Sequence, residues 1–185
     1  MMRTTLLCVA AFTAIGLAPL AHADDGTVDF QGKLVSQTCR LDINGTPSFM
    51  STVLLPKVST SALTTAGQTT GQTGFTIGLS NCAGAAKSAA AFFEHTSLTP
   101  IDPVTGNLVN ASVGARAANV QLQLIDAVNG KPIRVGDTGQ LTSTTQVPID
   151  ASGNARLPYA VQYYATGITT AGKVRGDVYF SISYQ

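Results

Sequence analysis

The sequence is poor in the side chains that build catalytic and metal-binding sites. It contains no tryptophan, two histidines and three cysteines, and only 11% of its residues are charged. Zinc and copper sites need several histidine and cysteine ligands, so the chain offers too few for either metal. It also lacks the nucleophile elbow of serine hydrolases and the glycine-rich loops that bind phosphates or dinucleotides. We therefore expect neither an enzyme nor a protein with a metal or other cofactor.

The first 23 residues are typical of a secretory signal peptide. Arg3 precedes an apolar run at 6–17, and a small-residue cleavage pattern follows at 21–23. The run is shorter than the roughly 20 residues that a membrane-spanning helix needs. Cleavage after Ala23 removes 23 of the 185 residues and leaves 162, with 10 basic and 10 acidic side chains. This balance gives no electrostatic footprint for nucleic acid or for an anionic membrane.

Cleavage leaves two cysteines, Cys39 and Cys82, and one histidine, His95. In an exported protein, two cysteines most simply form one disulfide. The alternative, a cysteine nucleophile, would depend on His95 as its base, and we favour the disulfide. An oxygen-only calcium site at 150–154 is conceivable, but its spacing fits a polar turn better than an EF-hand loop.

Strand signals recur along the mature chain, and no segment holds a convincing helical period. The expected strands lie between clusters of glycine, proline, asparagine and serine; they span 27–43, 51–58, 74–82, 88–96, 119–126, 158–166 and 174–185. Asn129-Gly130 predicts a tight turn, whereas the alanine-rich stretch 83–91 is ambiguous between helix and loop. Several short strands separated by turns predict an all-β sandwich or barrel.

Both ends of the mature chain are strand-like. The last ten residues carry one apolar row on a single face, formed by Val178, Phe180, Ile182 and Tyr184. A strand that ends the chain at a sheet edge offers unpaired backbone groups, which proteins usually cover. A second row on one face lies near the N-terminus and consists of Val28, Phe30, Gly32 and Leu34. This stretch precedes Cys39 and is either the first strand of the sandwich or an arm that reaches a neighbouring molecule.

Five motifs spread over nearly the whole mature chain carry a resemblance. They are T-V-x-F-x-G-x-L-V before a cysteine, G-F-x-I-x-L-x-x-C, A-x-N-V-x-x-Q-L-x-D, Y-Y-A-T-G and a final strand ending Tyr-Gln. Together they resemble the subunits of type 1 fimbriae that the chaperone-usher pathway assembles. In that family a glycine fourteenth from the C-terminus and a penultimate tyrosine belong to the segment that a periplasmic chaperone recognises. The matching positions here are Gly172 and Tyr184.

The resemblance implies an incomplete immunoglobulin-like β-sandwich, the pilin fold, which lacks its last strand and carries an N-terminal donor-strand extension. It divides the chain into a signal peptide at 1–23, the extension at 24–38 and a pilin domain at 39–185. The N-terminal row would supply the donor residues Val28, Phe30, Gly32 and Leu34. The strand that meets the chaperone and then the donor would carry Gly172, Val178, Phe180, Ile182 and Tyr184.

The implied function is a structural subunit of an adhesive surface fimbria that polymerises by donor-strand exchange. Its expected partners are copies of itself and other pilus subunits in a head-to-tail polymer, a periplasmic chaperone and an outer-membrane usher. No nucleic acid and no small-molecule substrate is expected, and the expected location is the cell-surface fimbria, reached through the periplasm. The alternatives are a minor tip or anchor subunit and a secreted carbohydrate-binding β-sandwich, against which the lack of tryptophan argues.

Overall fold

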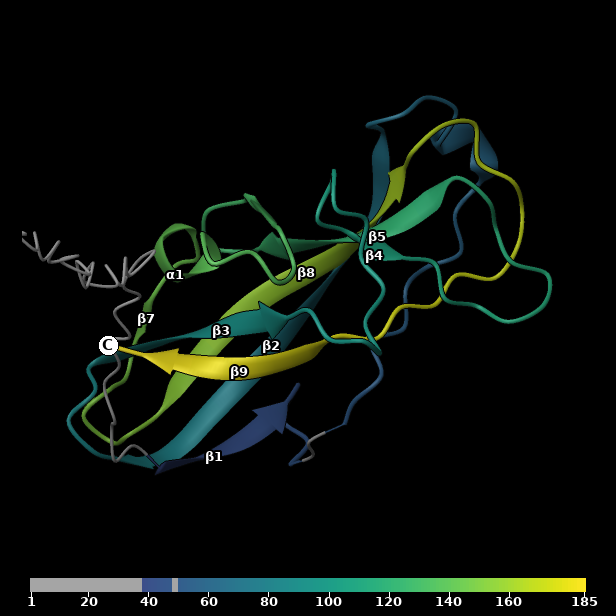
Figure 1. Ribbon diagram of the computed structural model, residues 1–185. Helices are drawn as coiled ribbons and strands as arrows, with labels where there is room; N and C mark the ends of the chain where they lie inside the picture. Colours follow the sequence, from purple (N-terminus) through teal and green to yellow (C-terminus); the bar gives the residue numbers. More distant parts are fainter. Residues whose placement is uncertain (1–37, 48–49) are drawn as a thin grey trace, which may run out of the picture. The chain divides into compact units, whose positions relative to one another are not determined.

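The computed structural model describes residues 38–47 and 50–185 (Figure 1). The chain divides into two units, Met1–Leu34 and Val35–Gln185, and every described residue belongs to the second. The predicted signal peptide and the donor row from Val28 to Leu34 lie outside the described residues, so they stay predictions. Within the described part of the chain, no helix has the length and apolar character needed to cross a membrane.

The described residues form nine β-strands and two short helical segments. The strands are β1 (Thr38–Ile43), β2 (Thr69–Ala83), β3 (Ser88–Glu94), β4 (Leu108–Val109), β5 (Val120–Asp126), β6 (Pro132–Ile133), β7 (Val147–Pro148), β8 (Ala155–Ala165) and β9 (Tyr179–Tyr184). A 3-10 helix at Thr60–Ala62 and the one-turn helix α1 (Gln140–Ser143) lie in connections. The all-β prediction is confirmed, and the ambiguous stretch 83–91 holds the end of β2 and the start of β3, with no helix.

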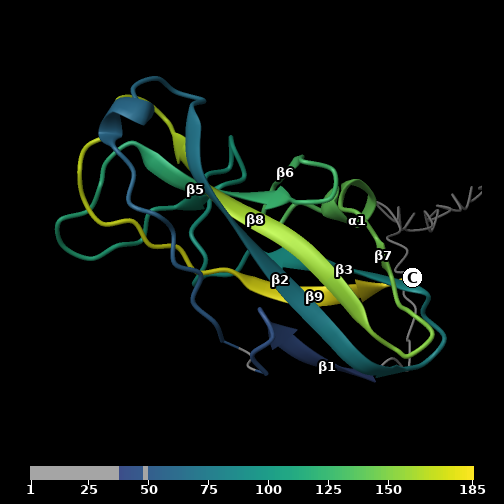
Figure 2. The ribbon, with the colours of Figure 1, turned by 180° about the vertical axis from the view of Figure 1, so that it is seen from behind.

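The strands pair antiparallel in two sheets. One sheet has the order β1-β2-β8-β5-β4, with β6 beside β5, and the other has the order β7-β3-β9. The long strands β2 and β8 run side by side behind β3 and β9 in Figure 1 and in front of them in Figure 2. Buried residues from both sheets form one core cluster, so this unit is a two-layer sandwich.

Alternating side chains explain how the central strands pack. Ile77 in β2 and Leu157 and Tyr159 in β8 are buried, as the period of two in a strand requires. Phe93 of β3 lies across from them; its ring stands edge-on to the Tyr159 ring at 5.0 Å between centroids. Burying each large apolar side chain stabilises the fold by about 1.5–3 kcal/mol. This cluster therefore holds the two sheets together.

Two of the expected strands lack part or all of their ladder among the described residues. The stretch 51–58 belongs to neither sheet, although Val53 and Leu55 are half-buried against the core and Leu54 between them is 83% exposed. The C-terminal strand begins at Tyr179, five residues later than expected. In both places the sequence pattern predicted the directions of the side chains correctly, but no described strand supplies the ladder.

The Asn129-Gly130 turn joins β5 to β6 as predicted. Gly130 has a φ of 72°, a left-handed value that glycine adopts without strain, and its N–H donates to the Asp126 carbonyl at 2.8 Å. The buried Asp126 carboxylate accepts the side-chain amide of Asn129 and the backbone N–H of Thr145. These bonds tie the hairpin to the segment that leads into β7.

A disulfide joins Cys39 in β1 to Cys82 in β2, as predicted. Strand β1 is an edge strand, and its ladder to β2 is irregular between Thr38 and Arg40, next to the cross-link. The two cysteines are 43 residues apart in the sequence. The bond therefore anchors an edge strand whose own ladder is interrupted.

Replacing both cysteines with alanine should lower the free energy of unfolding by about 4 kcal/mol, because cross-linking a loop of this length restricts the unfolded chain by that amount in the entropic account. Urea unfolding of the refolded full chain measures the difference between the oxidised wild type and the double variant. Equal stability of the two, or two free thiols in the mass of the mature protein, would contradict this prediction.

Candidate functional site

Among the described strands, β9 has a neighbour on one side only. It pairs with β3 along its whole length, and no described residue pairs with its other edge. Ser88 and Gln185 exchange two N–H···O bonds of 3.0 Å, and bonding directions alternate along an antiparallel strand. The residues whose N–H and C=O groups point away from β3 are therefore Phe180, Ile182 and Tyr184. Within the part of the chain that the structure describes, this row of backbone donors and acceptors has no ladder partner.

The side chains of the same row point into the sandwich. They pack against the core but are only half-buried, and they are Val178, Phe180, Ile182 and Tyr184. On the paired strand β3, by contrast, Ala89, Ala91 and Phe93 are at most 2% exposed. Partial burial also raises the pKa of the Tyr184 phenol. The structure thus brings together the four residues that the sequence predicted, on a face that its neighbours cover incompletely.

A pocket of about 430 Å³ lies beside the chain that leads into β9. Residues 55–60 form one wall, residues 169–174 form another, and the apolar part of the lining includes Leu63, Val120 and Tyr163. Val174 lines the pocket and also begins the alternation of half-buried residues that continues into β9. The incompletely covered row and the pocket are therefore parts of one apolar surface.

Two glycines let the chain pass close to its neighbours between the pocket and β9. A side chain at Gly172 would overlap the backbone of Arg116 and Ala117, and one at Gly176 would lie 3.0 Å from Leu122. Close backbone approach is therefore sufficient reason for glycine at position 172. The predicted place of Gly172 in a chaperone-recognised segment stays a prediction.

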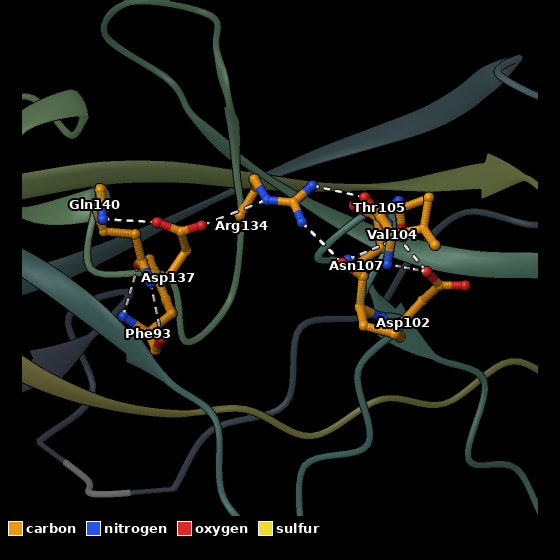
Figure 3. A network of polar contacts seen from close by, with 10 residues as sticks. Phe93, Asp102, Val104, Thr105, Asn107, Arg134, Asp137 and Gln140 are labelled. Carbon is orange, nitrogen blue, oxygen red and sulfur yellow. Dashed lines mark hydrogen bonds and ion pairs between the residues drawn. The ribbon is translucent and has the colours of Figure 1, made fainter.

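The opposite edge of the three-stranded sheet is closed largely by side chains. Strand β7 pairs with β3 over two residues only. Beyond it, the Tyr159 hydroxyl accepts the N–H of Ala91 at 2.8 Å, and the Gln140 side-chain oxygen accepts that of Phe93 at 3.0 Å. Gln140 also donates its amide to the Phe93 carbonyl (Figure 3). A buried backbone group left without a partner costs about 1–3 kcal/mol, so these bonds seal an edge that would otherwise be unstable.

Arg134 and Asp137 hold the loop that carries Gln140 (Figure 3). The Arg134 guanidinium donates to the backbone carbonyls of Pro103 and Val104 at 3.0 and 2.8 Å. Its Nε lies 3.6 Å from the Asp137 carboxylate, and the Asp137 carbonyl accepts the Gln140 N–H at 3.1 Å. The sealed edge therefore has its own support from a neighbouring loop.

The nearby carboxylates bind backbone groups. A hydrogen bond from the Thr105 backbone N–H lowers the pKa of Asp102. Asp150 accepts the backbone N–H groups of Ser152 and Asn154, which makes the segment 150–154 a polar turn. Within the described ranges, no three His, Cys, Asp or Glu side chains are grouped so that they could hold a metal ion. The candidate site is therefore the open edge of β9 and the pocket beside it.

Comparison with known proteins identifies the family. Residues 55–185 match the family model described as "Type-1 fimbrial protein, A". The chain therefore belongs to the type-1 fimbrial protein family. It is 41% identical over 172 residues to the F17 fimbrial protein of Escherichia coli, an alignment that covers 91% of each chain. Identity to the major fimbrial subunit SMF-1 of Stenotrophomonas maltophilia is 39%, over 92% of this chain and 99% of that protein.

A minor subunit and a solved rod subunit are also similar to this chain. The minor fimbrial subunit HifD of Haemophilus influenzae is 35% identical over 94% of this chain and 81% of its own length. Among solved structures, the P pilus rod subunit PapA is 15% identical, covers 79% of this chain and 99% of its own, and has a TM-score of 0.54. The predicted family and the incomplete immunoglobulin-like pilin fold are confirmed. The relatives are structural subunits of surface appendages, and both major and minor subunits occur among them.

The sealed edge of this fimbrial subunit has no signal in the sequence. Tyr159 was expected only as a strand residue, and Gln140 lies in a polar connection whose pattern predicts no contact. A period of two indicates which face of a strand a side chain occupies, but it does not indicate which distant backbone group its hydroxyl meets. The pocket was missed for the same reason, since its two walls are more than a hundred residues apart.

Tyr159→Phe should lower the free energy of unfolding by about 1–3 kcal/mol at neutral pH, because the Ala91 N–H loses its acceptor while the ring is kept. Burial raises the pKa of Tyr159 from 10.0 to about 12. A raised folded-state pKa stabilises the fold below the unfolded pKa and loses this contribution as the pH passes through the folded value. The difference between wild type and variant should therefore shrink from pH 10 to pH 12 in chemical unfolding; a constant difference would refute this assignment.

Proposed function

We propose that this fimbrial subunit polymerises head to tail by donor-strand exchange. The arm at 24–38 of one copy would lie along the open edge of β9 in the next copy and complete its sandwich. The observation that supports this most directly is the contrast between the two edges of one sheet: side chains seal the first, and the second is unpaired among the described residues. Donor and acceptor surfaces differ, so successive contacts do not close and a filament results.

The donor would run antiparallel to β9, with Val28, Phe30 and Leu34 turned inward and Gly32 allowing close approach. The half-buried row of β9 and the adjoining 430 Å³ pocket would together form the groove that receives the donor. The C-terminal end of the donor, at Leu34, would then reach the pocket side of this groove. Burying three large apolar side chains at roughly 1.5–3 kcal/mol each contributes about 5–9 kcal/mol before the cost of ordering the arm. Backbone hydrogen bonds along the open edge would add specificity for an extended strand.

A subunit that is in the periplasm and has not yet joined a fibre would expose the same edge. An exposed strand edge promotes aggregation. In this proposal a periplasmic chaperone covers the groove first and contacts the segment from Gly172 to Tyr184. An outer-membrane usher then exchanges the chaperone for the arm of the next subunit. The polymer extends from the cell surface as an adhesive fimbria in which copies of this chain and other pilus subunits are the partners.

A major subunit is the preferred role, because the chain carries both a candidate donor and a candidate acceptor and resembles SMF-1 over 99% of that protein. The match to the minor subunit HifD supports a tip or anchor position as the second candidate. Electron microscopy of a strain that lacks this chain separates the two. Loss of whole fibres indicates the major subunit, whereas fibres that persist with altered tips or anchoring indicate a minor one.

Phe180→Asp should strongly reduce the amount of subunit in the periplasm, because a carboxylate would face the core and the surface offered to the chaperone, and unprotected chains are degraded. Tyr179→Asp is the matched control: it places the same charge one residue earlier, on the outward face, where Tyr179 is 51% exposed. Immunoblots of periplasmic extracts compare the two. Equal accumulation would show that the inward row has no special role.

Moving the arm within one molecule should turn a polymer unit into a stable monomer. The variant deletes 24–38 and appends the same segment after Gln185 through a short turn, so that the donor returns antiparallel to β9. An intramolecular donor has an effective concentration in the millimolar range, and no free arm is left for a neighbour. We expect a monomer that needs no chaperone and has a markedly higher unfolding temperature, measured by sedimentation and calorimetry.

Two versions of the appended arm control this experiment. Phe30→Asp with Leu34→Asp should abolish the gain, because buried unpaired carboxylates are costly. Gln31→Asp adds charge on the outward face and should keep the gain. If the appended protein still polymerises, or if all versions are equally stable, the arm is not the donor.

A further inference from the structure

The groove beside β9 offers the donor arm more than one register, and the outward residues along its rim differ in charge. Exposed and half-buried residues alternate without a break from Lys173 to Ile182, so the chain keeps one inward and one outward face through the start of β9. Successive outward residues are Arg175, Asp177 and Tyr179. The Arg175 guanidinium lies 3.1 Å from the Asp177 carboxylate, and these side chains are 69% and 55% exposed. These three outward residues form the rim of the groove, and their side chains are positive, negative and neutral in that order.

The arm has a charge pattern of its own. Between the inward positions of the proposed donor, the outward residues are Asp29, Gln31 and Lys33. In an antiparallel pair, inward residues lie opposite inward residues, and a register shift must be by two residues to keep the apolar face inside. The three registers that such shifts allow near the pocket place Lys33 opposite Arg175, Asp177 or Tyr179.

The first and last of these registers are disfavoured. Lys33 opposite Arg175 brings two positive charges together, and like charges directly opposite each other across strands are destabilising. This register also places Gly32 opposite Gly176, so that neither strand has a side chain to fill the space inside the sandwich at that point. Lys33 opposite Tyr179 has no charge partner and sets Gly32 against Phe180.

The middle register matches both charge and size. Lys33 lies opposite Asp177 as an opposite-charge pair. Leu34 lies opposite Gly176, where the acceptor strand has no side chain of its own, and Gly32 lies opposite Val178. We infer that Lys33 of the incoming copy pairs with Asp177 of the acceptor and thereby fixes the register of the added strand. This inference rests on the proposed donor-strand function.

Cysteine pairs in the full-length chain test the register directly. In the middle register, positions 33 and 177 form a non-hydrogen-bonded pair, for which Cα atoms lie about 4.5 Å apart, within the range that a disulfide spans. Three double variants carry Lys33→Cys with Asp177→Cys, with Tyr179→Cys or with Arg175→Cys. Each is expressed in fimbriated cells, oxidised, and run on a denaturing gel without reductant. The pair with Asp177→Cys should give a ladder of covalent multimers, several-fold stronger than either other pair.

The outcomes separate the register from the proposed function. A ladder that is strongest with Tyr179→Cys or Arg175→Cys overturns the register but keeps the donor-strand mechanism. Intact fibres without a ladder in any pair also overturn the inference, because Lys33 then lies opposite none of these three residues, whereas the donor role is decided by the arm-transfer experiment.

Charge reversal gives a second measurement that needs no cysteine. Lys33→Glu or Asp177→Lys alone should reduce fibre yield by up to about fivefold, the size expected for one exposed ion pair, and the combination should recover it. Gln31→Glu with Asp177→Lys is the control and should not recover, since it places the new carboxylate two residues away along the arm, opposite Tyr179 in the middle register. A double reversal that is no better than the single ones overturns the inference.

Discussion

An unpaired strand edge in a sandwich has to be covered or protected, and among the described residues β9 is paired along one edge only. Two features go with this edge. The backbone groups of Phe180, Ile182 and Tyr184 have no ladder partner among the described residues, and their side chains are half-buried. One additional strand beside β9 would satisfy both at once. The pocket between 55–60 and 169–174 lies where such a strand would end.

The sealed edge shows that this opening is not a general weakness of the sheet. At the far side of β3, Tyr159 and Gln140 replace the missing ladder bonds, and Arg134 braces the loop that positions Gln140. The fold thus uses buried side chains to close one edge of a three-stranded sheet, whereas β9 has no such side chains among the described residues. Selective closure of one edge would limit strand addition in this sheet to the β9 edge, in keeping with the proposed head-to-tail polymer.

The sequence predicted those features that depend on local periodicity or on residue counts. Alternation placed β2, β3, β5 and β8 and the inward row of β9, and two cysteines in an exported chain predicted the Cys39–Cys82 bond. Features that depend on distant partners were not predictable. A period of two gives the direction of Val53 and Leu55 but not whether a ladder forms beside them, and strands of two residues, such as β4 and β6, have no period at all. Gln140 acts through a backbone group 47 residues away, which no local pattern encodes.

Affinity and register would have different origins in the proposed polymer. The inward residues of the arm would supply most of the binding free energy, because the gain from burying apolar area depends little on which apolar neighbour is met. For the same reason they discriminate poorly between registers: a shift by two residues keeps every apolar side chain inside. Discrimination must come from positions where neighbours differ in size or charge, and the acceptor has both within a few residues, at Gly176 and at Asp177. In the proposed polymer, the small and polar residues beside the apolar row would therefore be as necessary to an ordered fibre as the apolar row itself.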